Sequence, residues 1–246
     1  MPGSNQAAQR LQAVRQPWLW FAAALALAAF GFWPSFLSQP GVAPSHILIH
    51  GLSATLWMGL PVVQAVLIRR RQRVLHRQLG FASLVLAAVV AISGLHVVQT
   101  MVLTEAPGVT LTTFKFVLLD LTGIALFVLF VGLAVRAARR RDIPLHLRLM
   151  ACSAIIPLEA ANERTAILIG LVPDFSVALY AALFSVELIC GALILAEWRF
   201  GRVRWPVPLL LGYYLVMHVI ATPVALSPGF QAFSLWYARI GGWPAG

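Results

Sequence analysis

Two histidines, His46 and His50, stand four residues apart in the apolar segment PSHILIHGLSATLWMG. On a helix this spacing places both rings on one face, which is the geometry in which two imidazoles chelate one metal ion. His96 and His218 fall in two other apolar segments, at a similar depth below the same end of the expected helices. The histidines therefore predict an imidazole-rich site between helices.

Carboxylates fall at a similar depth along the expected helices. The segment IIPLEAANERTAILIG carries Glu159 and Glu163 one helical turn apart, followed by Arg164, and Asp120 lies in another apolar run. Imidazoles and carboxylates together suit zinc, iron or copper. We expect one group of residues to supply the metal ligands: His46, His50, His96, His218, Asp120 and Glu163. Glu159 is then the expected catalytic base on metal-bound water, and Arg164 offsets the negative charge.

Three other functions remain open for the same residues. His50 and His96 could be the axial ligands of a b-type haem, with Arg164 or Lys115 at its propionates. Buried acids and histidines also relay protons in transporters. Polar stripes can instead hold helices together in a membrane assembly factor or scaffold.

These residues must be positioned by membrane helices. The chain has 246 residues, of which 60% are hydrophobic and only 11% charged, so a soluble domain could not cover itself with polar groups. A spanning helix needs roughly 20 apolar residues. Seven such runs are present, at 17–37, 46–68, 79–103, 112–137, 147–171, 176–198 and 206–226. We predict an all-α, seven-helix domain over 17–226, preceded by a cytoplasmic tail (1–16) and followed by an outward interfacial segment (227–246).

The net charge of +10 is a signal of topology. Arginines cluster before the first run and after the second, fourth and sixth, whereas the other connections between the runs lack Lys and Arg. By the positive-inside rule, the amino terminus is cytoplasmic and the carboxyl terminus faces outward. The partner of the basic residues is therefore the bilayer and not nucleic acid. The polar pocket should open outward and act on a small or lipid-like molecule by hydrolytic or redox chemistry.

Two arginine-rich stretches resemble each other. RRRQRVLHRQLG (69–80) aligns without a gap onto RRRDIPLHLRLM (139–150) at an offset of seventy residues, and the same register places His50 over Asp120. This pattern predicts a hairpin repeat over 46–103 and 112–171. Within the second hairpin, Pro157 should kink the helix and free a backbone carbonyl near the site.

The stretches QAVLIRRRQRVLHRQLG and HLRLMACSAIIPLEAANERTAI resemble an uncharacterised family of bacterial multipass membrane proteins with HR-x-x-G and H-x-R-x-M motifs. The resemblance implies a bacterial inner-membrane protein of unassigned activity. The seven-helix arrangement is also similar to the zinc-dependent membrane hydrolases that include ceramidases and adiponectin receptors. Those proteins place HxxxH in the seventh helix and Asp in the third, whereas this chain has HxxxH in the second and Asp120 in the fourth.

Overall fold

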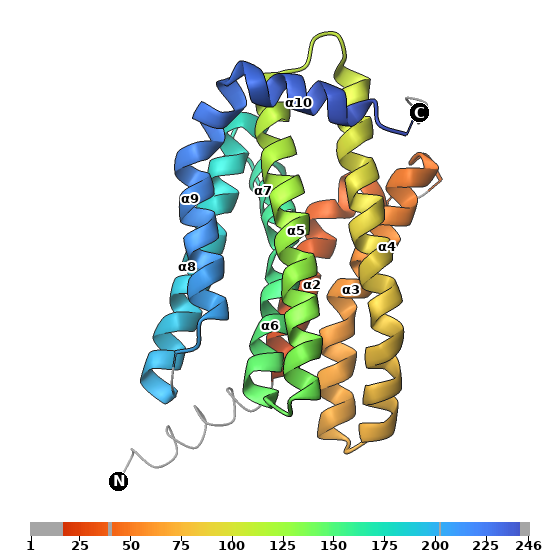
Figure 1. Ribbon diagram of the computed structural model, residues 1–246, viewed down its shortest axis with the longest axis vertical. Helices are drawn as coiled ribbons and strands as arrows, with labels where there is room; N and C mark the ends of the chain where they lie inside the picture. The colour runs from red at the N-terminus through yellow and green to blue at the C-terminus, as the bar shows by residue number, and fades with distance from the viewer. Residues whose placement is uncertain (1–16, 39–40, 202, 242–246) are drawn as a thin grey trace.

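The computed structural model describes residues 17–38, 41–201 and 203–241, and their regular structure is entirely helical (Figure 1). The helices are α2 (Pro17–Phe32), the π-helical turn η1 (Trp33–Leu37), α3 (Ser45–Arg69), α4 (Arg73–Glu105), α5 (Leu111–Arg139), α6 (Ile143–Ile155), α7 (Leu158–Leu168), α8 (Phe175–Phe200), α9 (Pro206–Leu226) and α10 (Pro228–Ala238). The expected tail over 1–16, and residues 242–246 of the expected final segment, lie outside the described residues.

Within the described residues, six helical segments are long and apolar enough to cross a membrane. They are α3, α4, α5, the α6–α7 pair taken together, α8 and α9. The first expected span, 17–37, forms α2 and η1, and α2 alone has 16 residues, fewer than the roughly 20 that a straight crossing requires. Large apolar side chains point outward from the bundle, including Val85 and Val219, which are 69% and 74% exposed. Such a surface is stable against lipid, which confirms the prediction of a membrane helical bundle.

The fifth expected span is interrupted at Ile156 and Pro157. Proline lacks an N–H and its ring clashes with the carbonyl one turn before it, so α6 ends at Ile155 and α7 begins at Leu158. The Tyr214 hydroxyl of α9 donates a 3.4 Å hydrogen bond to the Ile156 carbonyl. The interruption predicted from Pro157 is therefore present, and the Ile156 carbonyl beside it also accepts from the Glu159 N–H at 3.4 Å.

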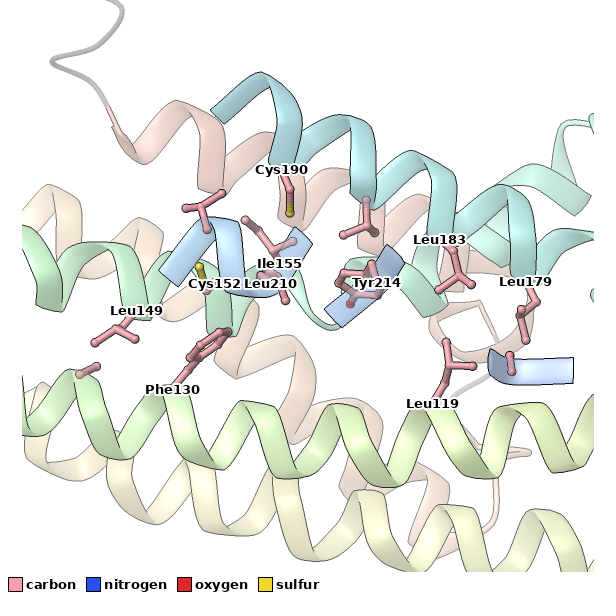
Figure 2. Packing of buried hydrophobic residues seen from close by; sticks show 14 of the residues in the cluster. Leu119, Phe130, Leu149, Cys152, Ile155, Leu179, Leu183, Cys190, Leu210 and Tyr214 are labelled. Carbon is pink, nitrogen blue, oxygen red and sulfur yellow. The ribbon is translucent and has the colours of Figure 1, made fainter. Parts of the chain in front are cut away.

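An apolar core joins α5, α6, α8 and α9 (Figure 2). Phe130 of α5, Leu149 of α6, Leu183 of α8 and Leu210 of α9 are each fully buried there. The two cysteines, Cys152 and Cys190, belong to the same core and are not joined by a disulfide. They act as small apolar side chains, as expected from their positions in the sequence.

The two arginine-rich turns have the same backbone geometry. Arg71 and Arg141 both adopt φ of 60°. The N–H of Arg70 bonds the carbonyl four residues earlier at 2.9 Å, and the N–H of Arg140 does so at 3.1 Å. The next two N–H groups in each turn also have equivalent acceptors at the offset of seventy. We call the end of the bundle that carries these turns the arginine-rich end.

Helix α10 lies across the opposite end of the bundle, as Figure 1 shows. Its carboxyl-terminal turn is fastened to α4 by Gln99, whose Nε2 donates to the carbonyls of Tyr237 and Ile240 at 3.2 and 3.1 Å. The Tyr237 hydroxyl donates in turn to the Leu95 carbonyl at 2.9 Å. This helix therefore covers part of the end from which the cavity described below is reached.

Close packing of α2 on α7 gives a test of the fold. A Cβ added at Gly31 would lie 2.5 Å from the Ala161 carbonyl oxygen and 2.8 Å from Thr165 Oγ1. Because a backbone carbonyl cannot move aside, Gly31→Ala should lower the free energy of unfolding by roughly 1–3 kcal/mol. Thermal unfolding in a mild detergent measures the effect.

The matched control is Gly132→Ala, because a Cβ there would meet no atom within 4 Å. This change should be neutral or stabilising, since alanine favours helix over glycine. Equal destabilisation by the two variants would contradict the α2–α7 contact.

Candidate functional site

A cavity of about 770 Å³ lies inside the bundle between α2, α3, α4, α5 and α7, with Tyr213 and Tyr214 of α9 also in its wall. Most of the wall is apolar, and it contains several large aromatic side chains. These are Phe32, Phe36, Trp57, Phe116 and Phe127. Trp57 is 1% exposed and packs edge-on against Phe127, with ring centroids 4.9 Å apart. The cavity is therefore large enough for a small organic molecule and has an apolar surface to hold it.

The cavity reaches the end of the bundle opposite the arginine-rich turns. Glu105 at the end of α4, Thr110 before α5 and Asp174 before α8 line it there. Hydrogen bonds from the Ser176 hydroxyl, and then from the backbone N–H groups of Val177 and Ser176, lower the pKa of Asp174 from its ordinary value. The mouth of the cavity therefore carries negative charge at neutral pH.

A polar zone lies deeper in the cavity. It is made by His50 of α3, Asp120 of α5, and Glu159, Glu163 and Arg164 of α7. The charges of Asp120, Glu159 and Glu163 act on one another, and Arg164 acts on all three. The structure thus brings together five of the eight residues to which a site role was assigned from sequence.

Glu159 and Glu163 are the most deeply buried ionisable groups of this zone, with exposed fractions of 8% and 3%. One oxygen of each, Oε1, is buried without a hydrogen-bond partner among the described residues. An acceptor buried in this way costs roughly 1–3 kcal/mol, and more if it is charged. These two oxygens are therefore the places where a proton or a donor group of a ligand would be held most strongly.

Arg164 balances this negative charge without binding any one carboxylate directly. Its guanidinium lies over the Phe32 ring, 4.5 Å from the centroid, and Nη1 donates to the Ala160 carbonyl at 2.9 Å. In the described part of the chain it forms no direct ion pair. Its positive charge consequently acts on the three carboxylates through space.

His50 faces the same cavity from the other side and is held by Ser93. The Ser93 hydroxyl donates to the Val89 carbonyl at 2.6 Å, so its oxygen accepts from His50 Nδ1 at 3.1 Å. This assignment leaves Nε2 as the unprotonated ring nitrogen. A Cβ at Gly94 would lie 3.2 Å from His50 Cε1, so the missing side chain there admits the ring. His50 can therefore accept a hydrogen bond from a ligand.

The other predicted histidine ligands lie elsewhere. His46 and His96 pack against each other near the end of α3, with ring centroids 5.2 Å apart. His218 of α9 pairs with Glu187 of α8, with 3.0 Å between Nδ1 and Oε1. None of these residues lines the cavity. In residues 17–38, 41–201 and 203–241, no three His, Cys, Asp or Glu side chains are grouped so that they could hold a metal ion.

Lys115 and Asn162, polar residues of the fourth and fifth expected spans, also have partners outside the cavity. Lys115 Nζ lies 5.0 Å from the centroid of the Tyr180 ring, beside the His218–Glu187 pair. Asn162 donates to the Ser185 hydroxyl and so joins α7 to α8. Both residues contribute to contacts between helices.

Tyr213 is a cavity residue that the sequence analysis missed. Its hydroxyl bonds Thr122 Oγ1 at 2.9 Å and the Leu119 carbonyl at 3.2 Å, both in α5. Because Tyr214 follows it directly, helical periodicity alone would place only one of the two rings toward the interior. The adjacent hydroxyl-bearing residues of α9 were the available signal, since tyrosine hydroxyls within a membrane need partners.

Charge balance in the cavity gives a second test. Arg164→Met removes the only arginine or lysine among the described residues that line it, so the free energy of unfolding should fall by roughly 3 kcal/mol as the carboxylates lose compensation. The double variant Arg164→Met with Glu163→Gln removes one charge of each sign and should recover at least half of that loss. Thermal unfolding of the three proteins in detergent decides the question. A double variant less stable than Arg164→Met alone would show that Arg164 acts through packing.

Comparison with known proteins adds no further information. No known protein family, curated protein or solved structure matches this chain. The resemblance of its arginine-rich stretches to a bacterial membrane-protein family therefore stays a prediction, and the cavity itself is the basis for a functional proposal.

Proposed function

We propose that this protein binds an amphipathic small molecule in the membrane, with an apolar body against the aromatic walls and a cationic or donor-rich head group at Glu159 and Glu163. One observation carries the proposal. Among the described residues, five acidic side chains line the cavity, Glu105, Asp120, Glu159, Glu163 and Asp174, against one arginine or lysine, Arg164. A ligand with a positive charge or several N–H or O–H donors would complete this charge balance.

The acidic residues at the mouth of the cavity and in its polar zone suggest how such a ligand would enter. Glu105 and Asp174 at the mouth attract a cation by long-range electrostatics, and the deeper carboxylates then hold it. The positive-inside rule would orient this mouth toward the outer side of the membrane. The ligand would thus enter from outside or from the outer leaflet.

An organic ligand agrees better with this geometry than a transition metal or haem does. His96 and His218 have partners outside the cavity, so His50 is the only histidine in its lining. A tetrahedral metal site generally needs three or four protein ligands, and a bis-histidine haem needs a second axial ring. The single imidazole is better suited to accept a hydrogen bond from the head group.

The proposal can be tested with three probes that share one apolar body: aminoadamantane, adamantanol and adamantane carboxylate. Binding to protein in lipid nanodiscs should be strongest for the amine and weakest for the carboxylate, with at least about tenfold between them. Glu159→Gln and Glu163→Gln should each weaken amine binding by about tenfold or more, because each removes a charge-assisted hydrogen bond.

Glu187→Gln is the matched control, since Glu187 is a largely buried acid of a membrane helix that pairs with His218 outside the cavity. This variant should bind the amine as the unchanged protein does. If folded protein binds the amine no better than the alcohol, or if Glu187→Gln weakens binding as much as Glu163→Gln does, the proposed site is wrong.

A further inference from the structure

A second hollow, of about 270 Å³, lies at the arginine-rich end between α5, the start of α6 and the start of α9. Its lining includes Arg136 of α5, Arg140 directly after α5, Leu145 of α6, and Trp205, which precedes α9. Asp142 is the one carboxylate in its wall. This hollow is separate from the cavity that contains Glu159 and Glu163, which we call the acidic cavity. The lining of the hollow is mainly basic and apolar.

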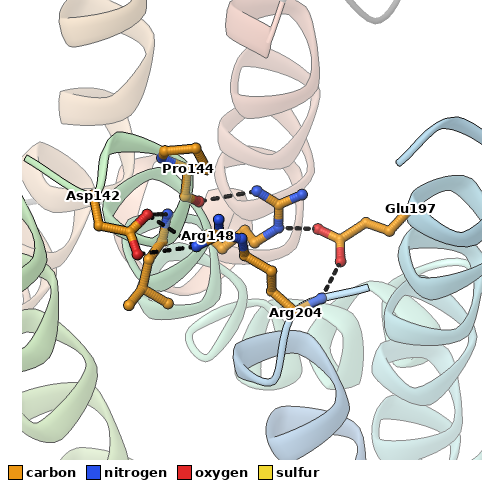
Figure 3. Close-up of polar contacts among 6 residues, drawn as sticks. Asp142, Pro144, Arg148, Glu197 and Arg204 are labelled. Carbon is orange, nitrogen blue, oxygen red and sulfur yellow. Dashed lines mark hydrogen bonds and ion pairs between the residues drawn. The ribbon is translucent and has the colours of Figure 1, made fainter. Parts of the chain in front are cut away.

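The carboxylates at this end already have partners (Figure 3). Asp142 accepts two hydrogen bonds from Arg204 Nη1, at 2.9 and 3.0 Å. Glu197 accepts from Arg148 Nε and from the backbone N–H of Arg204. The other acidic residues of the chain lie in the acidic cavity or in α8 beside His218. No carboxylate therefore remains at this end to pair with Arg136 and Arg140.

Arg136 lies in the last turn of α5, and Arg140 caps the helix four residues later, with its N–H bonded to the Arg136 carbonyl at 3.1 Å. Their side chains therefore lie on the same side of the helix end. Two like charges at this spacing destabilise a helix slightly, unless an anion lies between them. Neither guanidinium has a hydrogen bond or ion pair to another described residue. Two guanidinium groups on one face fit a phosphate group. Each guanidinium can donate two parallel N–H hydrogen bonds to the phosphate oxygens.

Apolar groups complete the lining of the hollow. Trp205, which is 45% exposed, lies with Leu133 and Leu145 around the two arginines. Tryptophan is enriched where helices leave the hydrocarbon and enter the head-group layer. The hollow therefore combines a phosphate-binding face with an apolar face at the level where a phospholipid presents both.

We propose that this hollow binds the phosphate group of an anionic phospholipid, with Arg136 and Arg140 as its ligands and Trp205 against its glycerol and upper acyl carbons. The lipid would bridge α5, α6 and α9 next to the Asp142–Arg204 ion pair. This inference does not depend on the ligand of the acidic cavity. It also gives a partner to two arginines that form no ion pair with any other described residue.

The chain contains its own control. The turn at residues 70–72 has the same backbone geometry at the offset of seventy, but Val66 stands in the position of Arg136 and Gln72 in that of Asp142. Arg69 and Arg70 are exposed arginines at the same end of the bundle. The variant Arg69→Gln with Arg70→Gln therefore removes the same total charge from an equivalent turn.

The experiment measures thermal stability in a neutral detergent on addition of phosphatidylglycerol, phosphatidylcholine or inorganic phosphate. Phosphatidylglycerol should stabilise the unchanged protein and the Arg69, Arg70 control alike. Arg136→Gln with Arg140→Gln should bind it at least about tenfold more weakly. The lysine pair Arg136→Lys with Arg140→Lys should give an intermediate affinity, because it keeps charge and loses the fork.

Three results would overturn the inference. The first is an equal response of the glutamine variant and the control, which would reduce the effect to general surface charge. The second is stabilisation by inorganic phosphate at the same concentration as the lipid, which would assign the hollow to a free anion. The third is equal stabilisation by phosphatidylcholine, which would show that the net charge of the head group is not recognised.

Discussion

The cost of placing charged groups inside a membrane domain is the constraint on which the arrangement of this bundle depends. Helix α7 carries Glu159, Glu163 and Arg164 within eleven residues, so the side of the helix that bears them cannot face lipid without exposing ionisable groups. The structure encloses it between α2 and α8. Gly31 allows α2 to approach the Ala161 carbonyl closely, and the Asn162–Ser185 bond ties α7 to α8. A short apolar helix, α2, thus has a structural purpose, which is to cover the charged one.

The break at Pro157 makes this arrangement possible. A continuous helix from Ile143 to Leu168 would have to keep one axis along its full length, whereas the interruption lets α6 pack in the apolar core and α7 turn its acids toward the cavity. At the break, the Ile156 carbonyl accepts from the Glu159 N–H and from the Tyr214 hydroxyl, both at 3.4 Å. The Tyr214 hydroxyl therefore ties α9 to the backbone at the break.

Much of this fold could be predicted from the residues alone. The expected span 206–226 coincides with α9, the spans at 46–68 and 176–198 differ from α3 and α8 by one or two residues, and the proline break lies where it was expected. These features are local, because apolar length and proline chemistry act within one segment. The grouping of Asp120, Glu159, Glu163 and His50 followed from their similar depth. The same reasoning misplaced His96 and His218 with respect to His50.

Depth along the membrane normal is only one coordinate, and the direction in which a helix face points is set by its neighbours. His218 has the correct depth, but α9 presents it to α8, where Glu187 is its partner. His96 lies one helix from His50 yet packs on His46, with ring centroids 5.2 Å apart. The adjacency of α2 and α7 joins the first and fifth expected spans, and no local pattern in either segment predicts that contact.

The offset of seventy residues explains how two similar hairpins produce one asymmetric site. At this offset, His50 corresponds to Asp120 and its partner Ser93 to Glu163. Trp57 corresponds to Phe127, and these two rings contact each other beside the cavity. The position equivalent to Pro157 is Ala87, so α4 continues unbroken where the second hairpin is interrupted. Only the second hairpin can therefore turn a charged segment toward the cavity. The carboxylates of the polar zone then lie on one side of the cavity and the His50 imidazole on the other. In the proposed complex, the head group lies between His50 Nε2 and the carboxylate oxygens of Glu159 and Glu163. A ligand with donors on both sides is oriented because one hairpin supplies the imidazole and the other supplies the acids.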